Sequence, residues 1–238
     1  LPPVQEKIYS SQCGQDFIAH RLLNLARSDV APSADYRPFY VDLAAHEPYY
    51  ISSTYFLDRV MHWQGICIEG SFIHFFPLLS ERTCQVYGAA VTEANAPPTV
   101  PFRLETDGAF SGIVFPSQGN DKRVVHVPSA TLLSILRDAR APPVIDFFSL
   151  DVEGAEWLAM KDFDFSQYQF RMLSIERPPE SLANLLRQHQ YEYVGLLSSP
   201  QHGEQLWLHA SFLTVLRRKN VKLDLKSLLD GYTGARCT

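Results

Sequence analysis

The sequence lacks the features that mark several classes of protein. No stretch approaches the roughly 18 consecutive apolar residues that a membrane-spanning helix needs. Lys and Arg number 21 against 26 Asp and Glu, with no basic block, which argues against a surface for nucleic acid or anionic membrane. No Asn-x-Ser/Thr sequon occurs. The opening LPPVQEKIYSSQ has no basic segment followed by an apolar one, so no targeting peptide is predicted.

Cysteine is also scarce. The four cysteines, Cys13, Cys67, Cys84 and Cys237, form no Cys-x-x-Cys pair, so a zinc site is not expected. Cys67 and Cys84 flank one predicted strand–helix–strand unit and could form a disulfide, although two buried free thiols fit the sequence equally well. A disulfide would favour a lumenal, extracellular or organellar location, whereas free thiols would favour the cytoplasm.

What the chain does contain fits one large α/β domain, or less well two small ones, since 238 residues at 46% hydrophobic content support a sizeable core. The most informative stretch is VIDFFSLDVEGAE, residues 144–156. A near-continuous apolar run that stops at a glycine-containing turn predicts a strand buried on both faces of a parallel sheet. Ligands bind beyond the carboxyl ends of such strands, where Asp151, Glu153 and Glu156 follow. The alternative is that Asp151 caps the next helix and both glutamates are solvated.

The alternation of apolar runs and helical periods predicts a doubly wound, Rossmann-like, mostly parallel sheet with helices on both faces. A domain at 36–210, interrupted by an insertion at 94–127, follows an N-terminal extension with a helix at 1–35. The tail at 211–238 carries leucines that pack either on the core or on a protein partner. The predicted strands are 39–43, 65–69, 84–91, 101–104, 124–127, 144–150, 171–176, 191–197 and 204–209. The predicted helices are 15–27, 54–62, 72–80, 128–137, 155–161 and 179–190.

Carboxylates end several of the predicted strands. Asp42, Glu69, Asp151 and Glu176 should meet at one edge of the sheet. In dinucleotide-binding folds, an acidic residue that ends the second strand accepts hydrogen bonds from both ribose hydroxyls, and Glu69 has that place. The alternative is that each is a lone charge at a strand end near solvent.

The chain resembles the FkbM family of S-adenosylmethionine-dependent methyltransferases. The resemblance covers roughly residues 9–210 and consists of many short motifs in the family's order. These motifs are SQCGQD (11–16), FYVDLAAHEP (39–48), SST (52–54), WQGICIEGSF (63–72), LLSERTC (78–84), SGI (111–113), LDVEGAE (150–156) and SIE (174–176).

The resemblance implies a class I methyltransferase fold that binds S-adenosylmethionine. Asp42 and the following loop would face the methionine part of this cofactor, Glu69 would bind the ribose, and Asp151 would lie near the transferred methyl group. Gly70 and Ser71 would lie beside the adenine. The implied cofactor-binding residues are Asp42, Ala44, Ala45, His46, Thr54, Glu69, Gly70, Ser71 and Asp151.

The chain departs from the family in the loop after the first strand. The family's usual Asp-x-Gly-Ala-Asn-Asp-Gly is here DLAAHEP, from Asp42 to Pro48. Glycine permits positive φ and close approach to a ligand, whereas Pro48 fixes φ and removes a donor. The loop is therefore predicted to be altered, and the cofactor is either retained or lost.

Three functions of different classes follow. The first is an O-methyltransferase acting on a hydroxyl of a sugar, glycan or small metabolite, with Asp151, Glu153 and Glu176 as candidate general bases and His46 as a further one. The second is a catalytically inactive relative serving as a subunit of a larger assembly. A nucleotide- or sugar-nucleotide-binding domain is a third reading. The carboxylates could also hold Mg²⁺ or Ca²⁺, but no histidine or asparagine completes a site, so no metal is predicted.

Overall fold

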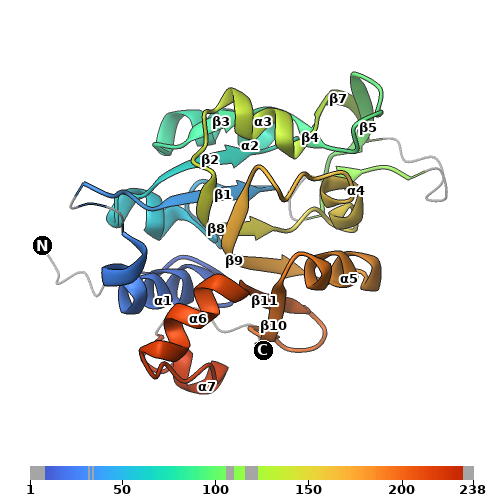
Figure 1. Cartoon of the computed structure of the whole chain (residues 1–238). Helices are drawn as coiled ribbons and strands as arrows, with labels where there is room; N and C mark the ends of the chain where they lie inside the picture. The colour runs from blue at the N-terminus through green and yellow to red at the C-terminus, as the bar shows by residue number, and fades with distance from the viewer. Residues whose placement is uncertain (1–8, 32, 34, 106–109, 116–122, 233–238) are drawn as a thin grey trace, which may run out of the picture.

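The computed structural model describes residues 9–31, 33, 35–105, 110–115 and 123–232. Its centre is a seven-stranded sheet of order β10-β11-β9-β8-β1-β2-β3 (Figure 1). Every neighbouring pair is parallel except those of β11, which runs antiparallel to both β10 and β9. The strands are β1 Phe39–Leu43, β2 Gln64–Ile68, β3 Gln85–Tyr87, β8 Val144–Leu150, β9 Gln169–Glu176, β10 Tyr191–Leu196 and β11 Glu204–His209. The predicted doubly wound α/β fold is confirmed.

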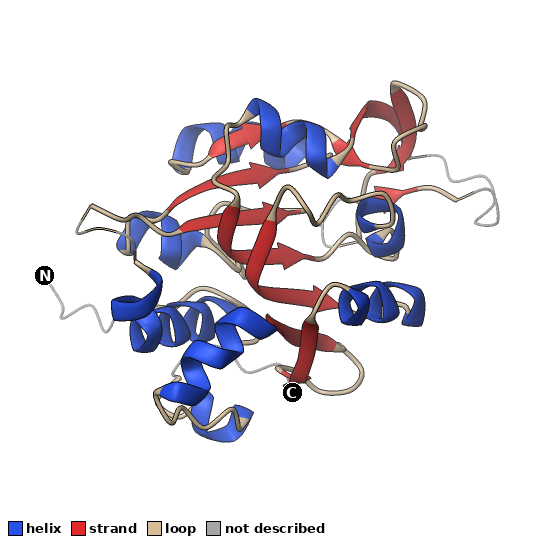
Figure 2. Cartoon of the chain, in the orientation of Figure 1, coloured by secondary structure: helices blue, strands red, loops and turns tan. Residues whose placement is uncertain are grey.

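Helices cover both faces of this sheet (Figure 2). Successive side chains of a strand point to opposite faces, so β1 serves two cores. Tyr40 packs with α1 (Gln15–Val30), the π-helix η1 (Phe56–Val60) and α6 (Ala210–Arg218). Val41 and Leu43 pack on the other face. The helices of that face are α3 Leu132–Asp138, α4 Glu156–Met160 and α5 Glu180–Gln188.

The predicted strand 84–91 is wrong. It is two strands, β3 and β4 (Ala90–Val91), which belong to different sheets. The predicted helix 128–137 also begins too early, because β7 (Val124–Ala130) continues through Pro128 and pairs there with β5 (Thr99–Arg103). Helix α3 starts only after Thr131, whose hydroxyl accepts a hydrogen bond from the Ser134 amide and so caps the helix.

The insertion forms a second sheet of order β4-β7-β5-β6, with β6 at Gly112–Ile113. It packs onto the end of β2 through Phe102. A Cβ on Gly70 would lie 2.8 Å from the Phe102 ring, so only glycine allows this approach. The insertion therefore borders the edge of the main sheet where the predicted site lies.

The predicted helix 54–62 differs in detail from its prediction. It is a single-turn π-helix rather than an α-helix, and the Ser52 hydroxyl accepts hydrogen bonds from the amides of Thr54 and Tyr55, just before this helix begins. The predicted helix 72–80 is α2 (Phe72–Glu81), and Pro77 lies in its interior.

The described part of the tail packs on the main core. Leu228 of α7 (Leu225–Leu228) and Tyr232 are buried in the same cluster as α1, and the Tyr232 hydroxyl donates to the Ser11 carbonyl over 2.7 Å. The ends of the predicted extension and tail, 1–8 and 233–238, lie outside the described residues. No described helix is both long enough and apolar enough to cross a membrane.

Candidate active site

A cavity of about 290 Å³ lies at the carboxyl edge of the main sheet. It collects the ends of β1, β2, β8 and β9, the first residue of β11 and residues of the insertion. Thr54 and Ser71 are fully buried outside its lining, so they act on it only through neighbours. The other predicted site residues all line it: Asp42, Ala44, Ala45, His46, Glu69, Gly70, Asp151, Glu153 and Glu176.

Glu69 is fixed by backbone donors. Its carboxylate accepts from the Ser71 amide over 2.6 Å and from the His46 amide over 2.9 Å. It is only 5% exposed, and burial raises its pKa to about 7 although these hydrogen bonds oppose the shift. Each carboxylate oxygen has a second lone pair, so Glu69 keeps acceptor capacity toward the cavity.

The loop after β1 keeps a glycine-like backbone without glycine. Ala44 has φ of 64° and His46 has φ of 51°, both left-handed. Such a conformation costs an alanine about 1–2 kcal/mol. The amides of Ala44 and Ala45 donate to the Ile68 carbonyl, which ties the loop to β2. The altered loop thus lines the cavity and leaves it open.

His46 brings an imidazole to the cavity wall. Its ring lies tilted against that of His74 in α2, with 4.2 Å between the ring centroids. In the described chain, neither ring nitrogen of His46 has a hydrogen-bond partner, nor has Nε2 of His74. Burial lowers the pKa of His74. The two ring nitrogens of His46, which lines the cavity, would gain hydrogen bonds from a polar ligand there.

Hydrogen bonds to buried groups outside the cavity fix the side chain of Asp42. Its carboxylate accepts a hydrogen bond from the Thr54 hydroxyl, and that hydroxyl in turn accepts from the buried guanidinium of Arg82 over 2.7 Å. Burial raises the pKa of Asp42, and Arg82 opposes the shift. Thr54 therefore positions Asp42 rather than the cofactor.

The three candidate bases form a compact acidic group. One carboxylate oxygen from each of Asp151, Glu153 and Glu176 lies within 4.8 Å of the others. Burial raises the pKa of Asp151 well above its ordinary value, and the neighbouring carboxylates Glu176, Glu204 and Glu153 raise it further. Among the described residues, Oδ1 of Asp151 is buried without a hydrogen-bond partner. Crowding of like charges at one buried acid is typical of functional sites.

The turn after β8 projects this group. Glu153 and Gly154 both have positive φ, 53° and 96°, which turns the chain sharply after the strand. Glu156 is buried and its carboxylate accepts from the Gly154 amide over 3.0 Å. Asp151 does not cap α4, whose first turn follows Ala155 with no side-chain cap. The alternative in which Asp151 caps this helix and Glu156 is solvated is therefore wrong.

Acidic groups of this kind can hold a hard divalent cation. No metal site is predicted here from the sequence. Arg177 already supplies positive charge there. Its guanidinium pairs with Glu176 and, over 3.2 Å, with Glu153. Of the three carboxylates, Asp151 is the one with a buried oxygen that lacks a hydrogen-bond partner within the described residues.

Several lining residues escape the sequence-based predictions. Glu204 begins β11, and because β11 is antiparallel, the first residue rather than the last reaches the cavity. It lies opposite Glu176 and accepts from the Ser174 hydroxyl; burial raises its pKa to about 7. Arg177 directly follows a predicted strand-end acid, a signal that could have found it. Phe102 gives no such signal, because its place depends on how the insertion packs.

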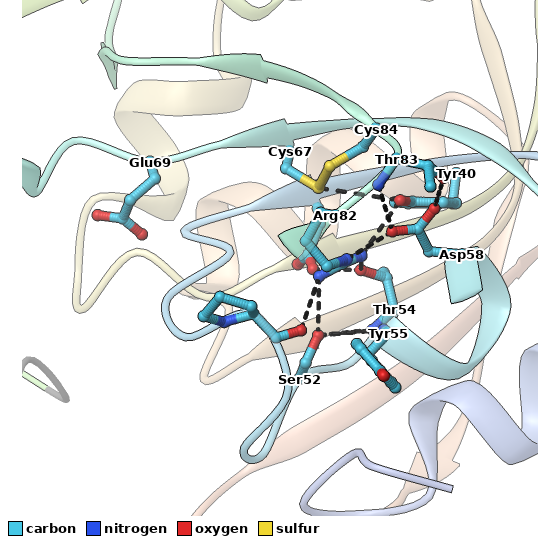
Figure 3. The surroundings of a disulfide bond; sticks show 12 residues. Tyr40, Ser52, Thr54, Tyr55, Asp58, Cys67, Glu69, Arg82, Thr83 and Cys84 are labelled. Carbon is cyan, nitrogen blue, oxygen red and sulfur yellow. Dashed lines mark hydrogen bonds and ion pairs between the residues drawn. A yellow bond between two sulfur atoms is a disulfide. The ribbon is translucent and has the colours of Figure 1, made fainter. Parts of the chain in front are cut away.

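Cys67 and Cys84 form a disulfide, one of the two alternatives that the sequence left open. No cysteine within the described residues is a free thiol. The bond joins β2 to the segment between α2 and β3, next to the buried Arg82 (Figure 3).

Comparison with known proteins agrees with this geometry. The family model described as the methyltransferase FkbM domain matches residues 42–193, which begin at Asp42 and include Glu69, Asp151 and Glu176. No curated protein shows significant similarity to the chain. The strand order, with one reversed strand next to the edge, is that of the class I methyltransferase fold. Because the match covers more than half of the sequence, the chain belongs to the FkbM methyltransferase domain family.

Proposed function

We propose that the protein is an S-adenosylmethionine-dependent O-methyltransferase acting on a hydroxyl of a sugar, glycan or small metabolite. The observation that carries this proposal is the meeting of two strand-end acids in one cavity. Glu69 and Asp151 follow strands on either side of β1, and both face the cavity. Glu69 has the place of the residue that accepts hydrogen bonds from the ribose hydroxyls, and Asp151 has the place of a general base.

The residues present fit the cofactor of this family. Glu69 keeps lone pairs for ribose hydroxyls, and the unpaired nitrogens of His46 and the free Asp151 oxygen offer further polar contacts. The volume, about 290 Å³, is close to the lower end of the ~300–1,000 Å³ typical of ligand pockets. When bound, S-adenosylmethionine supplies a methyl group on a positively charged sulfonium. The surplus of carboxylates over cations in the lining favours a positively charged ligand.

Asp151 is the residue proposed to remove the proton of the acceptor hydroxyl. A general base is most effective when its pKa lies near the working pH, and burial with neighbouring carboxylates moves the pKa of Asp151 in that direction. Glu153 and Glu176 supply negative charge beside Asp151, and the guanidinium of Arg177 offsets part of this charge. Orientation of the acceptor by these groups supplies much of the remaining rate.

The acceptor side of the cavity favours a hydroxyl-rich molecule. Carboxylates accept hydrogen bonds from hydroxyl groups, and Gln201, His202 and Arg177 add further polar groups at this end. The Cys67–Cys84 disulfide supports an oxidising compartment, such as a lumenal, extracellular or organellar one.

One observation favours the second candidate, a catalytically inactive subunit. The left-handed Ala44 and His46 replace residues that adopt this backbone more readily, which is expected where selection on the loop has relaxed. The cavity that persists beside them favours the enzyme.

The test is calorimetric titration of the purified chain with S-adenosylmethionine and S-adenosylhomocysteine. Wild type and Glu47→Ala, which changes a loop carboxylate outside the lining, should both show saturable binding, whereas Glu69→Ala should show none. Transfer of a labelled methyl group to hydroxylated acceptors then follows. Wild type that binds neither ligand would contradict the enzyme and support the inactive subunit. Equal binding by Glu69→Ala would show that the cofactor lies elsewhere.

A further inference from the structure

The side chain of Arg82 is completely buried beneath the loop that follows β1, residues 44–54, which we call the cofactor loop. A guanidinium carries five N–H donors, and here each has an acceptor. Nε donates to Asp58 over 2.6 Å, Nη1 donates to the Pro48 carbonyl and the Ser52 hydroxyl, and Nη2 donates to the hydroxyls of Tyr40 and Thr54. Figure 3 shows the guanidinium surrounded by Ser52, Thr54, Tyr40 and Asp58. A buried charge with this many fixed partners imposes one geometry on them.

Three of these partners lie in one stretch of chain, the second half of the loop between β1 and η1. Arg82 contacts Pro48 and Ser52 in the loop and Thr54 at its end. The Thr54 hydroxyl passes the constraint to Asp42, which lines the cavity. A continuous chain of hydrogen bonds therefore runs from the guanidinium to the cavity wall.

The disulfide holds the segment that carries Arg82. Cys84 lies two residues beyond Arg82 and is bonded to Cys67 in β2. Thr83 between them binds Asp58 through its amide, over 3.0 Å, and through its hydroxyl. Tyr40 completes the group, because its hydroxyl accepts from Arg82 and lies 3.8 Å from the Cys67 sulfur.

We infer that Arg82 is the positioning residue of the cofactor loop and that the Cys67–Cys84 disulfide holds it in place, so that opening this bond weakens cofactor binding. The inference rests on the proposed function. A dithiol reductant would supply two electrons and two protons, leaving Cys67 and Cys84 as thiols while it becomes a disulfide itself. The glycine-poor loop would then depend on an arginine whose own segment is no longer tied to the sheet.

The experiment compares three variants with a matched control. Arg82→Lys keeps the charge but loses the planar fork of donors. Thr54→Val cuts the link to Asp42 and keeps the Arg82–Asp58 ion pair. The double variant Cys67→Ala with Cys84→Ala removes the disulfide. The control is Arg171→Lys, the same exchange in the ion pair with buried Asp146, at 3.0 Å, away from the cavity lining.

Two quantities are measured: the dissociation constant of S-adenosylhomocysteine, and the hydrogen-exchange rates of the backbone amides of residues 44–54. Each of the three variants should weaken binding about tenfold or more, the equivalent of one lost hydrogen bond to a charged group. Exchange in the loop should rise by a similar factor. Arg171→Lys should lower the melting temperature while its dissociation constant stays within about twofold of wild type.

A folded Arg82→Lys or disulfide-free variant with the wild-type dissociation constant would overturn the inference. Should Arg82→Lys fail to fold, Thr54→Val and the cysteine variant decide in the same way. If wild type binds neither S-adenosylmethionine nor S-adenosylhomocysteine, the proposed function fails by itself. Loop exchange then decides: rates no faster than in Arg171→Lys overturn the anchoring role, and selectively faster rates support it.

Discussion

The two ends of the cavity differ in how their charged groups are satisfied. At the end formed by β1 and β2 the charged groups have partners: Arg82, behind the cavity wall, pairs with Asp58 and uses every donor, and Glu69 accepts from two backbone amides. At the end formed by β8, β9 and β11, like charges crowd, and Asp151 keeps a buried oxygen without a partner in the described chain. One end is stabilised by its contacts, and the other is destabilised by them.

The pKa values express this difference. Burial raises the pKa of both Glu69 and Asp151. At Glu69 backbone hydrogen bonds oppose the shift and one carboxylate, Asp42, adds to it, whereas at Asp151 several neighbouring carboxylates add to it. A group with satisfied hydrogen bonds suits the binding of an unreactive part of a ligand. A crowded acid suits proton transfer. This difference supports the proposal that the first end binds the cofactor and the second carries the chemistry.

The largest expected effect is on the rate of methyl transfer by Asp151→Asn. The variant keeps the shape of the side chain but removes the base, so the rate should fall about 10²–10⁴-fold while cofactor affinity changes little. The measurement is single-turnover transfer of a labelled methyl group. In wild type the rate should also fall as the pH drops through the raised pKa of Asp151, because the base must be ionised. A rate within threefold of wild type at every pH would place the base elsewhere.

A second prediction separates the two ends by stability. Burial raises the pKa of Glu204 from about 4.5 in the unfolded chain to about 7 in the folded chain. Between pH 4.5 and pH 7, the folded state therefore keeps a proton on Glu204 that the unfolded state has released. The free energy of unfolding should therefore fall as pH rises from about 4.5 to 7, by about 3 kcal/mol. Glu204→Gln should remove this loss and be more stable than wild type at pH 8. Denaturant titrations at pH 5 and pH 8 measure both.

Glu69→Gln is the matched test at the other end. The pKa of Glu69 in the wild-type protein is also about 7. The glutamine side chain has only one acceptor oxygen, so it cannot replace both carboxylate oxygens that accept from the Ser71 and His46 amides. This variant should be less stable than wild type at pH 8, where Glu204→Gln is more stable. If the two substitutions changed stability in the same direction at pH 8, the contrast between the two ends would not hold.

The smallest expected effect concerns the loop backbone. Ala44→Gly should stabilise the protein by up to about 1 kcal/mol, because glycine adopts the left-handed conformation without the penalty that alanine bears. Its neighbour provides the control: Ala45 does not have positive φ and is buried, so Ala45→Gly should destabilise. Thermal unfolding of both variants gives the comparison. A loss of stability in Ala44→Gly would mean that the strain of this loop is relieved in some other way.

Much of the site follows from local patterns. Asp42, Glu69, Asp151 and Glu176 each end an apolar run, and parallel strands bring such ends to one edge whatever the details of packing. Glu204 could not be found in this way, because its place depends on the reversed direction of β11. The split of 84–91 into β3 and β4 was equally hidden, since one continuous β-like pattern served two sheets.

The sequence by itself determined the order of strands and helices, the positions of the strand-end acids and the replacement of glycine in the loop. These depend on residue type and spacing, which the chain carries locally. Only the tertiary structure decided that Cys67 pairs with Cys84, that Arg82 reaches Pro48, Ser52 and Thr54, and that the pKa of Asp151 rises. Disulfides, buried ion pairs and desolvation depend on neighbours that are distant in the sequence, and folding alone brings those neighbours together.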